Sequence, residues 1–233
     1  MSFPLPWEEG RMTRLALLFL VLGAVFLCFY FFFLFFFNQR MEKEARSSFL
    51  NSFGYQFYAS MDMKARTGLY VLLIFSCLLI GAGEVIYLSS MNSYVFLILS
   101  VLFPLSLLFL TDSNLTPLSK YHLHILFDGI GFVFFALSCL VFGFSSLIPG
   151  AVLYKGSISL ASQIIVGAIG ALALLSLFNK RLLDWSKMER SEVDGTTYYQ
   201  KPKVNFLALY EWCFILAEMV VELVFFVNGM LLG

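Results

Sequence analysis

Charged side chains are scarce in this 233-residue sequence, where Asp, Glu, Lys and Arg together make up 13% of the residues. Soluble domains carry about a quarter charged residues. Hydrophobic residues make up 60% of the chain and include 28 phenylalanines, which is more apolar side chain than a soluble domain of this size can bury. These proportions exclude a soluble enzyme, a disordered regulator, and collagen-like or disulfide-rich secreted proteins. Because 15 basic residues balance 15 acidic ones, the net charge predicts no nucleic-acid partner.

Cysteine and histidine are also few. The four cysteines lie in long apolar runs without a C-x-x-C motif, so we expect small hydrophobic thiols rather than disulfides or a metal cluster. Only two histidines are present, which excludes a zinc site built on three of them. The sequence contains no G-x-S-x-G, Walker or H-E-x-x-H motif. It therefore predicts no catalytic residue and no cofactor.

Six apolar runs reach or approach the length of about 20 residues that a helix needs to cross a bilayer. The runs lack the alternation of barrel strands, so helices are expected. We therefore predict an all-α polytopic membrane protein, a single domain over residues 1–233 that folds as a six-transmembrane-helix bundle. The predicted spans are residues 12–37, 67–88, 94–111, 121–148, 157–178 and 204–231.

Basic residues are distributed unevenly between the two sides of the predicted bundle. The first, third and fifth connections share one side and hold twelve Lys and Arg residues, against three on the other side. Short cytoplasmic loops are enriched in Lys and Arg, so this bias places connections 38–66 and 179–203 in the cytoplasm and both termini outside it. An endomembrane or the plasma membrane is favoured. A glycan at the sequon of Asn114, in the third connection, would contradict this orientation.

The first connection carries an apolar residue at every fourth position, namely Met41, Ala45, Phe49, Phe53 and Phe57. One interpretation is an amphipathic helix in the membrane interface, with its basic residues toward the headgroups. The other is a loop whose aromatic side chains fold back onto the bundle. In the fifth connection, Trp185, Tyr198 and Tyr199 are typical of the interfacial aromatic belt.

Ionisable residues inside the apolar runs are costly in a membrane, so each one needs a physical reason. Glu84 lies in the second run. Glu211, Glu218 and Glu222 share one face of the last run because they are spaced by seven and four residues. This acidic face has three interpretations: a hydrogen-bonded seam to a neighbouring helix or partner subunit, a headgroup or cation site, or a proton relay.

Two histidines and an aspartate mark the start of the fourth run. His122 and His124 stand at its entrance, and Asp128 lies one helical turn beyond His124. His124 and Asp128 share a helix face and could supply two metal ligands, with a carboxylate from another helix as the third. Such a site would indicate a lipid-modifying membrane enzyme. The alternative is hydrogen bonding at the membrane interface without a metal.

The last run contains the segment LALYEWCFILAEM at residues 207–219, and the fourth run opens with histidines within residues 121–128. These segments resemble the Frag/DRAM-like family, which includes damage-regulated autophagy modulators, GPI-anchor lipid-remodelling proteins and adaptors for a phosphoinositide kinase. The resemblance implies six spans with both termini in the cytoplasm, opposite to the charge bias. It carries over His122 or His124, Glu211 and Trp212, whereas Glu218 departs from the family's usual Asn.

We predict a non-catalytic integral membrane regulator or scaffold in a lipid-related or membrane-complex process. Its expected partners are membrane lipids and other membrane protein subunits, and no nucleic acid. The residues expected to contact a partner or lipid are Glu84, Glu211, Trp212, Glu218, Glu222 and His122. One alternative is a structural accessory subunit of a larger complex, with its carboxylates buried against foreign chains. Another is a lipid-modifying enzyme that uses His124 and Asp128.

Overall fold

Six helices of the chain are long and apolar enough to cross a membrane, which confirms the predicted all-α six-helix bundle and identifies an integral membrane protein. The computed structural model describes residues 6–41, 47, 52–59, 61–91, 93–116, 120–148, 160–179, 189–193, 196–200 and 204–232. The long helices are α1 (Pro6–Arg40), α3 (Met63–Ser89), α4 (Tyr94–Leu115), α5 (Tyr121–Gly143), α6 (Leu160–Leu177) and α7 (Phe206–Leu232). Helices are stable in the hydrocarbon core of a bilayer because each one satisfies its own backbone hydrogen bonds.

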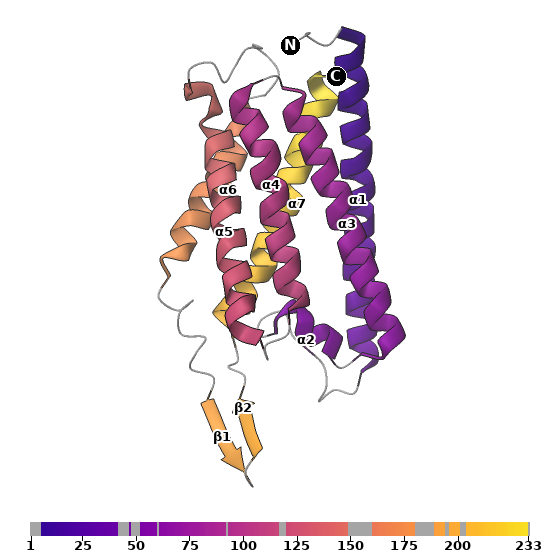
Figure 1. Ribbon diagram of the computed structural model, residues 1–233, viewed down its shortest axis with the longest axis vertical. Coiled ribbons are helices and arrows are strands. Elements are labelled where there is room, and N and C mark those ends of the chain that lie inside the picture. The colour runs from indigo at the N-terminus through magenta and orange to yellow at the C-terminus, as the bar shows by residue number, and fades with distance from the viewer. Residues whose placement is uncertain are drawn as a thin grey trace.

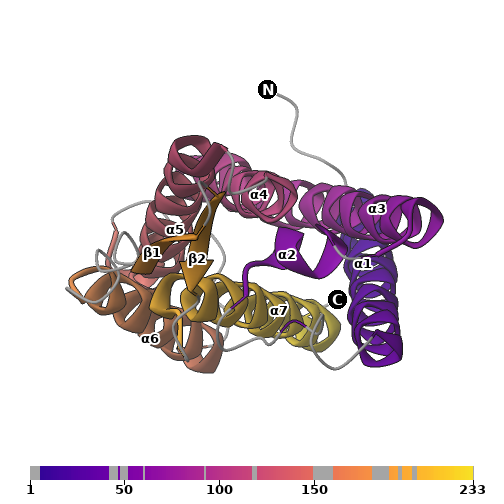
Figure 2. The same cartoon turned by 90° about the horizontal axis from the view of Figure 1, so that it is seen from below.

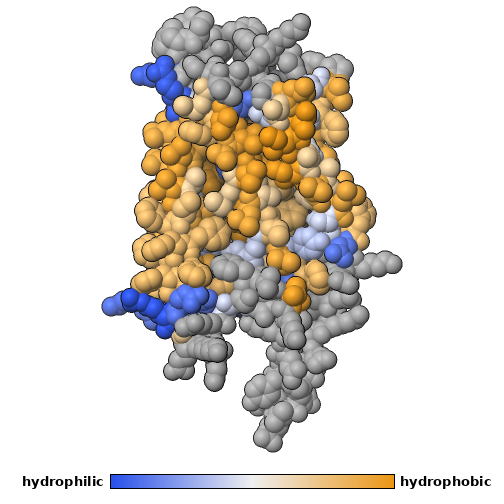
Figure 3. All heavy atoms as spheres, turned by 180° about the vertical axis from the view of Figure 1, so that it is seen from behind, coloured by the Kyte–Doolittle hydropathy of each residue, from blue (hydrophilic) through white to orange (hydrophobic). Residues whose placement is uncertain are grey.

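Seen end-on, the six long helices close a ring (Figure 2). Each helix packs against the next in the order α1, α3, α4, α5, α6, α7, and α7 returns to α1. Helix α1 begins and α7 ends at the same end of the bundle (Figure 1). Figure 3 shows the outside as a hydrophobic band with hydrophilic residues toward both ends, the distribution expected of a lipid-facing surface.

Helices α4 and α5 end four and five residues away from the ends of their predicted runs, the largest differences at a helix C-terminus. Helix α4 continues to Leu115 and includes the buried residues Ser113 and Asn114, which were expected in a connection. Polar side chains lower the hydropathy of a segment even when they are hydrogen-bonded inside the protein, so the predicted run stops too early. Helix α5 ends at Gly143, not at residue 148, and the 3₁₀ turn η2 (Ser145–Leu147) follows. Helix α6 approaches closely there, since a Cβ on Gly143 would lie 2.4 Å from the Cα of Gly167.

The first connection contains a short helix, α2 (Gly54–Ala59), that lies inside the ring at one end of the bundle (Figure 2). Phe53 and Phe57 are fully buried there. The described part of this connection therefore agrees with the interpretation in which aromatic side chains fold back onto the bundle. Ala45 and Phe49 lie outside the described residues.

The fifth connection contains two short strands, β1 (Glu189–Val193) and β2 (Thr196–Gln200). They pair antiparallel, with Glu189 opposite Gln200, and project from the same end of the bundle as α2 (Figure 1). Tyr198 and Tyr199 lie on β2, whereas Trp185 lies outside the described residues. The strands stand apart from the six long helices and leave the fold class unchanged.

Candidate functional site

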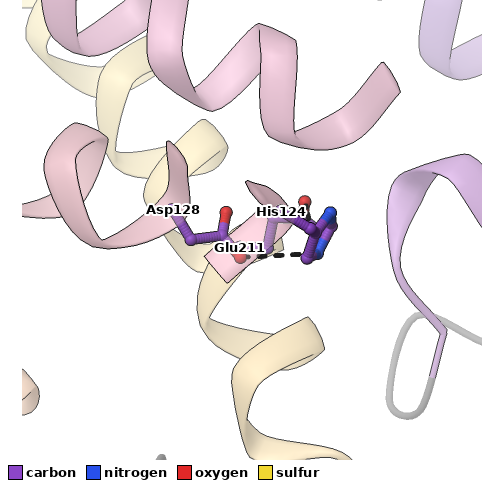
Figure 4. A group of neighbouring side chains, drawn as sticks. All are labelled: His124, Asp128 and Glu211. Carbon is purple, nitrogen blue, oxygen red and sulfur yellow. Dashed lines mark ion pairs between the residues drawn. The ribbon is translucent and has the colours of Figure 1, made fainter. Parts of the chain in front are cut away.

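A histidine and two carboxyl groups meet inside the bundle near α2 (Figure 4). His124 and Asp128 come from successive turns of α5, and Glu211 comes from α7. The Nε2 atom of His124 lies 3.5 Å from Oδ2 of Asp128 and 3.9 Å from Oε1 of Glu211, and all three side chains are buried. We call these residues the histidine–carboxylate site. The structure thus joins the predicted His124–Asp128 pair to a carboxylate from another helix.

Two backbone carbonyl groups orient the His124 ring. Its Nδ1 atom lies 2.9 Å from the carbonyl oxygen of Ser113 and 3.2 Å from that of Thr116. Because carbonyl oxygens only accept hydrogen bonds, Nδ1 carries a hydrogen and donates it to them. Nε2 is therefore the nitrogen that faces the two carboxyl groups. The ring of Phe53 covers the imidazole edge-on, with 4.7 Å between ring centroids.

Glu211 accepts hydrogen bonds from two other parts of the chain. The Ser113 hydroxyl donates to Oε1 at 3.2 Å, and the backbone N–H of Gly54 donates to Oε2 at 3.3 Å. Gly54 begins α2, and a side chain there would displace the Asn114 amide, since a Cβ would lie 1.8 Å from its Oδ1. Glu211 therefore links α7 to both α4 and α2.

The segment of residues 52–59 is fastened beside this site. The Trp212 indole donates to the Ser52 carbonyl at 3.0 Å, and the hydroxyls of Tyr30 and Tyr58 form a buried hydrogen bond. Burial raises the pKa of the Tyr58 hydroxyl well above its ordinary value, so the hydroxyl stays neutral. Trp212, predicted to contact a partner or lipid, is instead buried and holds this segment in place.

Glu84 of α3 and Glu218 and Glu222 of α7 form a second group, which we call the carboxylate trio. All three are buried, with exposed fractions of 0%, 3% and 4%. The Ser106 hydroxyl lies 3.4 Å from Oε1 of Glu218, but it donates a shorter hydrogen bond of 2.7 Å to the Phe103 carbonyl. Glu84 and Glu222 interact electrostatically. Among the described residues, however, no group other than these two carboxyls offers either of them a hydrogen bond.

The acidic face predicted on the last helix thus divides between two interior sites. Glu211 belongs to the histidine–carboxylate site, and Glu218 and Glu222 belong to the carboxylate trio. The chain itself buries all three, in line with the interpretation of a seam between helices, and their contact with a partner or lipid stays a prediction. His122, by contrast, is exposed at the start of α5. Glu222 also borders an opening toward the outside.

That opening is a pocket of about 620 Å³ between α1 and α7, which we call the lateral groove. Its lining comes from residues 20–32 of α1, residues 219–226 of α7 and Ile80 of α3, and Glu222 is the one charged residue among them. Val25, Phe29 and Leu223 at the groove are 44%, 49% and 59% exposed. The groove therefore opens on the lipid-facing surface.

Sequence analysis does not identify Ser106 and Ser113, whose hydroxyls contact Glu218 and Glu211. The two serines lie seven residues apart on α4, as the two glutamates do on α7. Residues at this spacing share one helix face, and the antiparallel arrangement pairs the earlier serine with the later glutamate. This matched spacing is the signal in the sequence that could have found them.

Comparison of the chain with known protein families, with curated proteins and with solved structures finds no match. A fold by itself does not specify a function, which depends on the geometry and chemistry of particular sites. The function is therefore inferred from the lateral groove, the histidine–carboxylate site and the sequence.

Proposed function

We propose that this chain is a non-catalytic integral membrane regulator or scaffold that holds the apolar chain of a membrane lipid in the lateral groove. The opening between α1 and α7 supports this proposal, because it faces the lipid-exposed surface and its lining is almost entirely hydrocarbon. Its volume falls in the range of small-molecule sites. An acyl chain can enter it from the bilayer without passing through water, and Glu222 offers one polar contact at its wall.

The resemblance to the Frag/DRAM-like family supports the same proposal, since that family includes lipid-remodelling proteins and adaptors for a phosphoinositide kinase. Three residues that carry the resemblance, His124, Glu211 and Trp212, lie around the docked segment 52–59. If the family shares this docked segment, its members need these three residues to hold it.

Photolabelling tests the groove. A phosphatidylcholine with a photoactivatable acyl chain is expected to label residues 20–32 and 219–226 in preference to the rest of the bundle. Ala24→Phe fills the groove and should reduce this labelling several-fold. Ala161→Phe, the same change at an exposed position of α6, serves as the control and should leave it unchanged. Uniform labelling around the ring, or equal effects of both variants, would contradict the proposal.

The accessory-subunit alternative expects Glu84, Glu218 and Glu222 to be buried against foreign chains. Because the bundle buries them itself, their burial gives no reason to invoke a partner. Other membrane subunits remain an expectation, which copurification at fixed stoichiometry from a gentle detergent would test.

A lipid-modifying enzyme is the second candidate function, and the histidine–carboxylate site favours it. An imidazole beside two carboxyl groups is a source of general acid–base catalysis, and Ser113 lies in hydrogen-bonding contact with that site. If this candidate is right, membranes containing the wild-type chain should differ in lipid composition from membranes containing His124→Gln. Identical compositions at equal protein levels would exclude it.

We also propose that connections 38–66 and 179–203 are cytoplasmic, on the basis of the twelve-to-three bias of basic residues. The sequon cannot test this, because Asn114 is buried and its amide donates to the Leu110 carbonyl at 3.0 Å. Its burial opposes a glycan on either side of the membrane. A split fluorescent tag at the C-terminus should instead be complemented from the non-cytoplasmic side. Complementation from the cytosol would favour the orientation implied by the family resemblance.

A further inference from the structure

We propose that the histidine–carboxylate site binds one divalent transition-metal ion of the zinc class. The ligands are Nε2 of His124 and one carboxylate oxygen each from Asp128 and Glu211. This inference goes beyond lipid holding and does not depend on the lateral groove. It revises the expectation from sequence that the chain takes no cofactor.

The distances between the candidate ligand atoms fit a small metal ion. All three atoms lie within 4.8 Å of one another, with Nε2 of His124 at 3.5 Å and 3.9 Å from the two carboxylate oxygens. In a tetrahedral zinc site with bonds of about 2.0–2.1 Å, ligand atoms lie about 3.3–3.4 Å apart. Small side-chain rotations would close the remaining difference.

Asp128 supplies an observation independent of the clustering. Its side chain is 1% exposed, and in the described part of the chain neither carboxyl oxygen makes a hydrogen bond. Its polar neighbours are Nε2 of His124, which carries no hydrogen when Nδ1 carries one, and the Ser113 hydroxyl, which contacts Glu211. A buried carboxylate that no donor satisfies is costly. A dication between Asp128 and Glu211 would supply the missing partner and neutralise both charges. One imidazole with two carboxylates is a ligand set that zinc accepts.

The surroundings of the ligands resemble the outer shell of a metal site. Ligating histidines usually donate their other ring N–H to a carbonyl or carboxylate, and ligating carboxylates are themselves hydrogen-bonded. Here Nδ1 of His124 donates to the carbonyls of Ser113 and Thr116, and Glu211 accepts from Ser113 and Gly54. The carboxylate trio has neither a histidine nor such support, so we expect no metal there.

Metal analysis of the purified full chain tests the site. The protein is produced with a tag that lacks histidine, in zinc-supplemented medium, and its metal content is measured by mass spectrometry. We expect about one zinc per wild-type chain and almost none in Asp128→Asn, which keeps the shape of the ligand but not its charge. Glu222→Gln, the matched change at a buried carboxyl of the trio, should keep the full zinc content. A chelator should lower the thermal midpoint of the wild type, and added zinc should restore it.

Ser113→Ala keeps all three ligands and provides a test that does not depend on the folding of Asp128→Asn. It removes one outer-shell hydrogen bond and should weaken zinc binding about tenfold. Wild-type protein without stoichiometric metal, and with a thermal midpoint insensitive to chelator and zinc, would overturn the proposal. The site would then be a proton-sharing hydrogen-bond network. The photolabelling of the lateral groove would be unaffected by that result, so the two proposals fail separately.

Discussion

The histidine–carboxylate site and the carboxylate trio both bury acidic side chains of α7, but their surroundings differ. Glu211 accepts hydrogen bonds from Ser113 and Gly54 and faces His124. The trio has three carboxyl groups and one long hydroxyl contact, from Ser106. The carboxyl groups are therefore buried in both places, but the described hydrogen-bond donors that contact them are more numerous at Glu211 than at the trio. Glu211 thus has partners from α4, α2 and α5, whereas the trio has one described hydroxyl contact, from α4.

The position of the trio explains its few donors. Glu222 lines the lateral groove, and Glu218 and Glu222 also border an internal cavity of about 30 Å³. A cavity of that size can hold one water molecule. Space beside these carboxyl groups is thus open to a lipid group or to water, whereas Glu211 is contacted by Ser113, Gly54 and His124. The trio therefore borders a cavity, whereas Glu211 lies where α7, α4 and α2 are in contact.

The largest expected effect on stability comes from Glu211→Leu, which removes the contacts of Glu211 with α4 and α2. This substitution leaves the Gly54 N–H without its acceptor and removes one acceptor of the Ser113 hydroxyl, which keeps the His124 carbonyl at 3.4 Å. An unsatisfied buried donor costs about 1–3 kcal/mol and a lost hydrogen bond about 0.5–1.5 kcal/mol, so we expect a loss of about 1.5–4.5 kcal/mol in the free energy of unfolding. Denaturation of the chain in mixed micelles, with chelator present, measures the change. A loss no larger than that of Glu218→Leu would erase the distinction between the two sites.

Gly54→Ala should have the next largest effect. A Cβ at this position would lie 1.8 Å from Oδ1 of Asn114, so the buried Asn114 amide or α2 must shift, and a shift of α2 strains its hydrogen bond to Glu211. Overpacking of this kind costs about 1–3 kcal/mol, and faster proteolysis within residues 52–59 should accompany it. Gly68→Ala is the matched control, because a Cβ there meets nothing within 4 Å. Equal stability of the two variants would show that α2 is not held as described.

Glu218 should respond more weakly, because its one hydroxyl contact is long. We expect Glu218→Leu to cost roughly 0.6–2 kcal/mol, the scale of hydrogen bonds between membrane helices. Glu218→Gln keeps an acceptor for Ser106 and should behave like the wild type if the contact is a packing seam. If Gln is as harmful as Leu in the same detergent, the charge of Glu218 matters and the seam interpretation is wrong. Wild-type behaviour of both variants would leave Glu218 without either role.

Glu222→Gln should have the smallest effect on stability. It removes one of the like-charged groups in the trio, and the Gln amide keeps a donor and an acceptor toward the neighbouring Glu84 carboxyl. Replacing buried charged groups is often neutral or stabilising, so we expect no loss and a gain of up to about 1 kcal/mol. A thermal melt beside the wild type checks this, and a clear loss would mean that Glu222 has a partner that depends on its charge.

The sequence by itself determined the class of the protein and its six helices. A bilayer dictates both the length and the composition of a spanning segment, so each apolar run predicts one helix without reference to its neighbours. The same reasoning located every carboxyl group inside the bundle, because an ionisable residue in an apolar run is conspicuous. It also placed His124 and Asp128 on one face, since their spacing of four residues is a property of a single helix.

Only the tertiary structure decided which of these groups meet. Glu211 and Glu218 share a face of α7, yet one reaches His124 and the other borders a cavity, because different helices and α2 stand opposite them at different heights. Gly54 could not be assigned from the sequence, since a glycine in a connection predicts a loop, and Ser113 shows only in the spacing that it and Ser106 share with the two glutamates. The lateral groove likewise depends on how far α1 stands from α7. Contacts between helices depend on the vertical register and the distance between neighbouring helices, and the hydropathy of the sequence gives neither of these.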